Sequence, residues 1–147
     1  MKTTQNESVK NVFLFLLVLM SLSFIGCSMV GRVIPDDKRI LLSDQEKGGG
    51  TFHDGGCTVE YSYRLTGDSM IIQGQAYYRR SVDLLDVRAM LLDTSGTVLD
   101  EKLVYASGYR ESRGRGIDRS FKETLIVPPG STGITFSCSV QERSSRP

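Results

Sequence analysis

Residues capable of acid–base or nucleophilic chemistry are few in this chain, and their spacing does not predict a catalytic group. The one histidine, His53, precedes Asp54, and Ser69 ends a short polar stretch at 66–69. A serine nucleophile needs a histidine within hydrogen-bonding reach to take its proton, and zinc needs three or four ligands. We therefore interpret 66–69 as a turn and His53 as a solvated side chain, and we predict no metal or other cofactor.

Two groups of arginine and tyrosine residues are candidate binding sites. The glycine-rich stretch 108–119 carries four arginines: Arg110, Arg113, Arg115 and Arg119. Guanidinium groups bind phosphate and carboxylate through paired hydrogen bonds. Tyr77 and Tyr78 precede two further arginines, a combination that suits contact with a protein or a glycan. Each group also has a structural alternative. The arginines of 108–119 could form a solvated edge with salt bridges, and Tyr77 and Tyr78 could mark the end of a strand, with one of the two rings in the core.

Cys27 follows a stretch that predicts export. Residues 12–26 form a run of 15 residues without charge, and Lys2 and Lys10 precede it. A membrane-spanning helix needs roughly 20 apolar residues, so this run is short for a span. A basic start, a short apolar core and a small residue at its end are typical of a signal peptide.

The junction Phe24-Ile25-Gly26-Cys27 resembles the lipobox of bacterial lipoproteins. This resemblance implies cleavage before Cys27 and attachment to a membrane through acyl chains on that residue. Two or three such chains make anchoring stable. In the family, an aspartate directly after the cysteine favours the inner membrane, so Ser28 favours the outer one, and the expected location is the bacterial cell envelope. The alternative is an ordinary secretory signal, or an uncleaved anchor, in which Cys27 has no role.

Cys57 and Cys138 remain once Cys27 is assigned to the lipid by that resemblance. Export would place them in an oxidising compartment, where disulfides persist. They lie 81 residues apart, and closing a loop of that size adds roughly 4–5 kcal/mol in the chain-entropy model. We predict a disulfide between them; two free buried thiols are the alternative.

The charge balance argues against a nucleic-acid partner. The chain has 18 basic and 17 acidic residues, and leaving out residues 1–26 removes two lysines and one glutamate. The remaining chain is neutral, so it has no overall field to steer nucleic acid or anionic lipid.

Alternating apolar and polar residues predict six short strands, and no stretch predicts a helix. In 57–65, for example, Cys57, Val59 and Tyr61 share one face with two further apolar residues. The predicted strands are 57–65, 70–80, 85–93, 97–106, 120–127 and 133–141. This pattern indicates an all-β antiparallel sandwich of six to seven strands. Both cysteines fall on apolar faces, in the first and last strands.

The domain boundaries follow from composition. We predict a signal peptide over 1–26, a lipid-anchored flexible tether over 27–56, a sandwich over 57–142 and a disordered tail over 143–147. Glycines at 48–50 and 55–56 favour flexibility in the tether. Its root-mean-square span would be on the order of 30 Å.

The stretch 70–140 is similar to small bacterial sandwich modules of the FxLYD type. The features are Gly74 in a strand, the run 86–100 (DVRAMLLDTSGTVLD) and the Pro-Gly turn before 133–136. The bridge between first and last strands is similar to the inter-sheet disulfide of immunoglobulin-like domains. Both resemblances imply a fold and, for the first, an envelope setting; neither implies chemistry.

The sequence therefore predicts a lipid-anchored protein of the cell envelope that is not an enzyme and serves as a binding or assembly accessory. A partner protein of the envelope could be bound by the arginine loop, or by a strand added at an open sheet edge. An envelope hydrolase with an unrecognised site and a spacer with no specific partner remain as alternatives.

Overall fold

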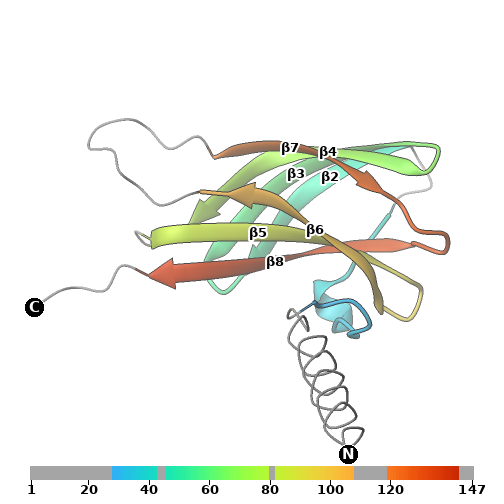
Figure 1. The fold of residues 1–147 in the computed structure, drawn as a ribbon, viewed down its shortest axis with the longest axis horizontal. Coiled ribbons are helices and arrows are strands. Elements are labelled where there is room, and N and C mark those ends of the chain that lie inside the picture. The colour runs from blue at the N-terminus through green and yellow to red at the C-terminus, as the bar shows by residue number, and fades with distance from the viewer. Residues whose placement is uncertain (1–27, 43–45, 80–81, 108–118, 143–147) are drawn as a thin grey trace, which may run out of the picture.

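Two antiparallel sheets make up the part of the chain that the computed structural model describes, residues 28–42, 46–79, 82–107 and 119–142 (Figure 1). Sheet I has the order β1-β8-β5-β6 and sheet II the order β2-β3-β4-β7. The strands are β1 (Ile40–Leu41), β2 (Lys47–Asp54), β3 (Cys57–Thr66), β4 (Ser69–Tyr78), β5 (Val82–Leu92), β6 (Val98–Ala106), β7 (Ser120–Ile126) and β8 (Gly133–Glu142). One short 3-10 helix, η2 (Asp36–Lys38), precedes β1. The predicted all-β antiparallel sandwich is confirmed, with eight strands in the described residues.

The core lies between the two sheets and is filled by the alternating apolar residues that predicted the strands. In β3, Val59, Tyr61 and Tyr63 are buried while their neighbours are exposed or half-buried. The Phe136 ring of β8 packs between rings of sheet II, with centroids 4.9 Å from Tyr61 and 5.6 Å from Phe52. Aromatic rings at these separations bury large apolar areas and favour tilted contacts such as these.

The disulfide joins Cys57 on β3 to Cys138 on β8, so it links sheet II to sheet I. The two Cα atoms are 6.5 Å apart, within the range that disulfides span. The predicted pairing is confirmed. Cys57 is fully buried and Cys138 packs against the same core.

The prediction of a flexible tether over 27–56 is wrong for Lys47–Asp54, which form strand β2 and pair with β3 over their whole length. The glycines of β2 allow close packing. A Cβ at Gly48 would overlap the Tyr63 ring, and a Cβ at Gly49 would lie 2.6 Å from the backbone oxygen of Tyr61. Glycine is used where another backbone or ring approaches this closely, whereas the sequence alone predicts flexibility from the same glycines.

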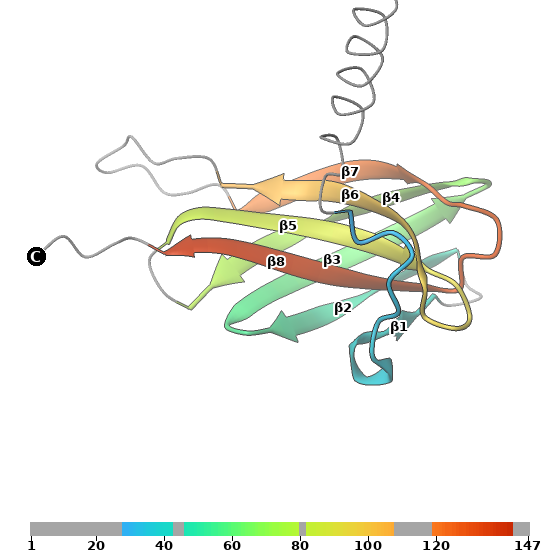
Figure 2. The ribbon, with the colours of Figure 1, turned by 60° about the horizontal axis from the view of Figure 1, so that its bottom comes forward.

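The segment 28–39, here called the N-terminal arm, lies against the outer face of sheet I and is also unlike a tether. Figure 2 shows it crossing β5, β6 and β8. Backbone hydrogen bonds run from Gly31 N to Val98 O (2.9 Å), from Val98 N to Arg32 O (2.8 Å) and from Ile34 N to Gly96 O (2.9 Å).

A second apolar cluster explains why the arm binds there. Ile34 of the arm packs with Met90, Leu92 and Val98, and all four are buried. Strand β5 is thus apolar on both faces, since Leu91 between Met90 and Leu92 belongs to the main core. A strand with two apolar faces needs a cover on each of them, and the arm supplies the second cover.

Candidate functional site

The outer face of sheet II, here called the polar face, collects exposed and half-buried side chains from all four strands. They alternate along each strand with buried residues, so they share one side of the sheet. The polar face comprises Lys47, Thr51, His53, Thr58, Glu60, Ser62, Arg64, Thr66, Ser69, Ile71, Gln73, Gln75, Tyr77, Ser120, Lys122, Thr124 and Ile126. Except for Ile71 and Ile126, every member can form hydrogen bonds.

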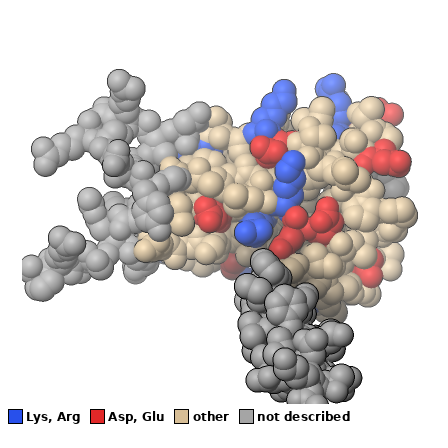
Figure 3. Space-filling view, in the orientation of Figure 1, with Lys and Arg blue, Asp and Glu red and all other residues tan. Residues whose placement is uncertain are grey.

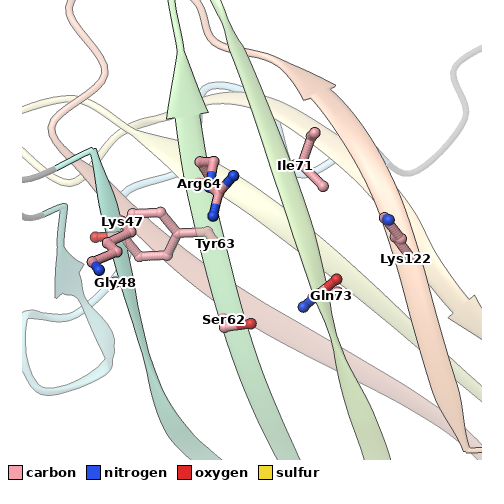
Figure 4. Close-up of a pocket in the computed structure, with 8 residues that line it drawn as sticks. All are labelled: Lys47, Gly48, Ser62, Tyr63, Arg64, Ile71, Gln73 and Lys122. Atoms are coloured by element: carbon pink, nitrogen blue, oxygen red, sulfur yellow. The ribbon is translucent and has the colours of Figure 1, made fainter.

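Strand register places cations at one end of this face. Lys47 of β2 is directly opposite Arg64 of β3, and Lys122 of β7 is opposite Gln73 of β4. Ser62 and Gln73 pair with each other across β3 and β4. Figure 4 shows Ser62 and Gln73 lying between Lys47 and Lys122.

A hollow of about 600 Å³ lies over these residues; we call it the basic hollow. Its lining includes Lys47, Ser62, Arg64, Gln73 and Lys122. It continues into a second depression of about 720 Å³, which shares Ser62, Gln73 and Lys122 with it. The two hollows together follow the polar face across β3, β4 and β7.

The three cations of the basic hollow have no acidic partner among the described residues. The ion pairs that the structure does form lie elsewhere, for example Lys38 with Asp54 (2.7 Å) and Lys102 with Glu123 (3.0 Å). Figure 3 shows Lys and Arg atoms beside Asp and Glu atoms over the middle of the visible face. Like charges directly opposite each other on neighbouring strands are destabilising, so Lys47 opposite Arg64 carries a cost that an anion would remove.

Lys38 shows the contrasting case of a paired cation. Its ammonium donates a hydrogen bond to the Asp54 carboxylate, and this bond, with the charge attraction, raises the pKa of Lys38 above its ordinary value. The pair ties the arm to the end of β2, so its role is structural.

Two residues predicted from the sequence meet at the other end of the polar face. The Arg119 Cζ atom lies 5.1 Å from the centroid of the Tyr77 ring, within the range of a cation–π contact. The Tyr77 hydroxyl donates a hydrogen bond to Gln75 Oε1. Tyr78 lies on the opposite side of β4, half-buried against the core, which matches the structural alternative for one of the two tyrosines.

Arg110, Arg113 and Arg115 of the predicted arginine loop lie outside the described residues, as does the proposed lipidation site Cys27. The predicted signal peptide at 1–26 and the predicted disordered tail at 143–147 also fall outside them. No helix formed by the described residues is long and apolar enough to cross a membrane.

The structure separates His53 from Ser69. His53 pairs with Thr58 and Ser69 with Thr66, at opposite ends of β3. Eight residues of extended strand between these positions correspond to about 26 Å, so His53 cannot take a proton from Ser69. The His53 Nδ1 atom lies 3.1 Å from Thr58 Oγ1. Within the described ranges, no three His, Cys, Asp or Glu side chains form a group that could hold a metal ion.

The basic hollow was missed from the sequence because its three cations are far apart along the chain. Lys47 fell in the expected tether, and Arg64 and Lys122 are single charges in separate strands. The polar positions of 58–64 and 71–77 did indicate an exposed face, but only the pairing of β2 with β3 and of β4 with β7 brings the cations together.

Comparisons of the chain with protein-family models, with curated proteins and with solved structures give no match. The resemblances to lipoproteins and to FxLYD-type or immunoglobulin-like modules therefore stay predictions.

Proposed function

We propose that the chain is a lipid-anchored protein of the bacterial cell envelope that binds a partner through its polar face and is not an enzyme. The observation that carries the proposal is the placement of unpaired cations on sheet II, while the N-terminal arm lies on sheet I. A chain held at Cys27 would keep sheet I on the side of its attachment and leave the polar face open.

The disulfide supports the envelope location. Structural disulfides persist in oxidising compartments and are rare in the bacterial cytoplasm, and Cys57 and Cys138 join the two sheets in the core. The outer membrane is the favoured site, because Ser28 follows the proposed acylated cysteine.

Labelling tests the anchor. A clickable palmitate analogue should label the wild type in its native host and should not label Cys27→Ser. The labelled wild type should sediment with membranes and dissolve only with detergent. An unlabelled wild type in the soluble fraction would overturn the lipid anchor.

Site-directed photocrosslinking tests the binding role. A photoreactive amino acid at Gln73, in the basic hollow, should shift the protein to higher apparent mass in intact cells, as a discrete band for a protein partner or as a smear for a polymer. The matched position is Ser139, which is exposed on β8 of sheet I. Equal crosslinking from both positions, or none from either, would contradict the proposal and favour a spacer.

A further inference from the structure

We propose that the basic hollow binds an acidic polysaccharide, with Lys47, Arg64 and Lys122 holding its carboxylate or phosphate groups. The inference rests on the proposed function in that it names the ligand class of the same face. It does not depend on the lipid anchor, so each can fail without the other.

The charges of the hollow select an anionic group. Three cations line it, and no described acidic residue pairs with them. The nearest acid along β3, Glu60, lies four residues from Arg64, which is about 13 Å of strand. The Arg64 guanidinium can bind a carboxylate or phosphate through two parallel hydrogen bonds, while the lysines act as point charges beside it.

The neutral groups between the cations select a hydroxyl-rich ligand. Ser62 and Gln73 are exposed and form no hydrogen bond through their side chains within the described part of the chain. A glutamine amide offers donors and an acceptor and a serine hydroxyl offers both, as sugar hydroxyls require. The continuing depression adds Thr51, Gln75 and Ser120, and also the Glu60 carboxylate. An extended chain can therefore lie across β3, β4 and β7 with its anionic groups at the cationic end of the face and its hydroxyl groups towards Glu60.

A folded protein fits this surface less well than a polysaccharide. Protein interfaces are centred on apolar or aromatic anchors that are buried on binding. The basic hollow offers a single exposed apolar side chain from this face, Ile71, which is 39% exposed. The lining of the hollow exposes more apolar than polar surface but no aromatic ring that protrudes to be buried by a partner, and Ile71 suits the apolar C–H face of a sugar ring.

Binding to defined polymers tests the inference. Full-length protein in detergent would be titrated with polygalacturonate and with phosphorylated dextran, and with unmodified dextran as the neutral polymer. Binding to either anionic polysaccharide, weakening with added salt, is expected, and the better of the two identifies the anionic group. Failure of both to bind would overturn the proposal. Polyglutamate serves as the control for an acidic polypeptide. If polyglutamate binds as tightly as the polysaccharides, the assignment of the ligand to a glycan is overturned.

Substitutions locate the site. Lys47→Gln, Arg64→Gln and Lys122→Gln should each weaken binding by about tenfold, the value for one charge-assisted hydrogen bond. Arg88→Gln is the matched control, because Arg88 is an exposed cation on sheet I; it should bind like the wild type. Lys122→Gln should keep the wild-type urea midpoint, and Lys47→Gln and Arg64→Gln should keep or slightly raise it, because each removes the like-charge pair across β2 and β3. Undiminished binding by the three variants, or an equal loss in Arg88→Gln, would place the site elsewhere.

Discussion

At the scale of the residue, one carboxylate, Asp93, organises a turn. Its Oδ1 atom accepts hydrogen bonds from Ser95 Oγ (2.7 Å), Ser95 N (2.8 Å) and Thr97 N (2.8 Å) in the turn between β5 and β6. The bond from the Ser95 hydroxyl, followed by that from Thr97 N, lowers the pKa of Asp93 from its ordinary value of 3.8. The same turn receives the arm, since Val33 bridges to Thr97.

This lowered pKa predicts a specific loss of stability in acid. Because the folded state binds the Asp93 proton less readily than the unfolded state, the carboxylate stabilises the fold above pH 3.8. That contribution is lost as the pH falls through the folded-state pKa. The free energy of unfolding of the wild type should therefore exceed that of Asp93→Asn at neutral pH, and the difference should shrink below about pH 4.

Urea titrations at several pH values would measure this difference. Ser95→Ala removes the leading hydrogen bond and should give an intermediate acid dependence. A difference between wild type and Asp93→Asn that is constant from neutral to strongly acidic pH would contradict the assignment.

At the scale of the strands, Gly74 of β4 lies directly against the backbone of β3. A Cβ at Gly74 would overlap the backbone oxygen of Glu60 and lie 2.9 Å from the Tyr61 Cα. Gly50 of β2 also faces Tyr61, but there a Cβ would lie 3.4 Å from the hydroxyl of a side chain.

These two glycines should respond differently to substitution. Gly74→Ala should lower the free energy of unfolding by about 1–3 kcal/mol, because a backbone atom cannot move aside as a side chain can. Gly50→Ala should change it by less than about 1 kcal/mol, in either direction, because alanine also restricts the unfolded chain. Chemical denaturation of both variants makes the comparison. Equal losses of unfolding free energy in the two variants would show that the close approach of the Glu60 backbone does not explain the glycine at position 74.

The arm should detach when its one buried side chain is shortened. Ile34→Ala removes apolar contacts with Met90, Leu92 and Val98, and such a change costs about 2 kcal/mol or more in a packed site. Hydrogen exchange of the Gly31, Ile34 and Val98 amides should then become at least about tenfold faster. Val33→Ala is the matched control, since Val33 is 64% exposed. Unchanged exchange in Ile34→Ala would mean that the backbone bonds alone hold the arm.

For the whole molecule, the disulfide should be a major source of stability. Replacing both Cys57 and Cys138 by alanine should lower the free energy of unfolding by about 2–5 kcal/mol, because the bond closes an 81-residue loop. Urea denaturation of the double variant, compared with the wild type in the presence and absence of reductant, measures the loss. Reduction should have no further effect on the double variant, and a reductant-insensitive wild type would contradict the prediction.

Much of the sandwich could be predicted from the sequence, because its strands carry their own signals. The alternation around Val59 and Tyr61 indicates β3, and the apolar positions of β8 place Cys138 towards the core. Strand β2 carries no such signal, since Gly48, Gly49 and Gly50 have no side chains to alternate. The basic hollow depends on β2 and on long-range pairing, so local pattern could not reveal it.

The close docking of the arm limits how far an acylated protein could stand from its bilayer. The first hydrogen bond of the body, from Met29 N to Glu101 Oε2 (3.3 Å), begins two residues after Cys27. Such a molecule would lie close to the lipid surface at a nearly fixed tilt. It would lack the range of motion of a domain on a long flexible linker. Its ligand would have to lie near the same bilayer. This favours polymers that are attached to that membrane or lie on its surface over polymers held at a distance from it.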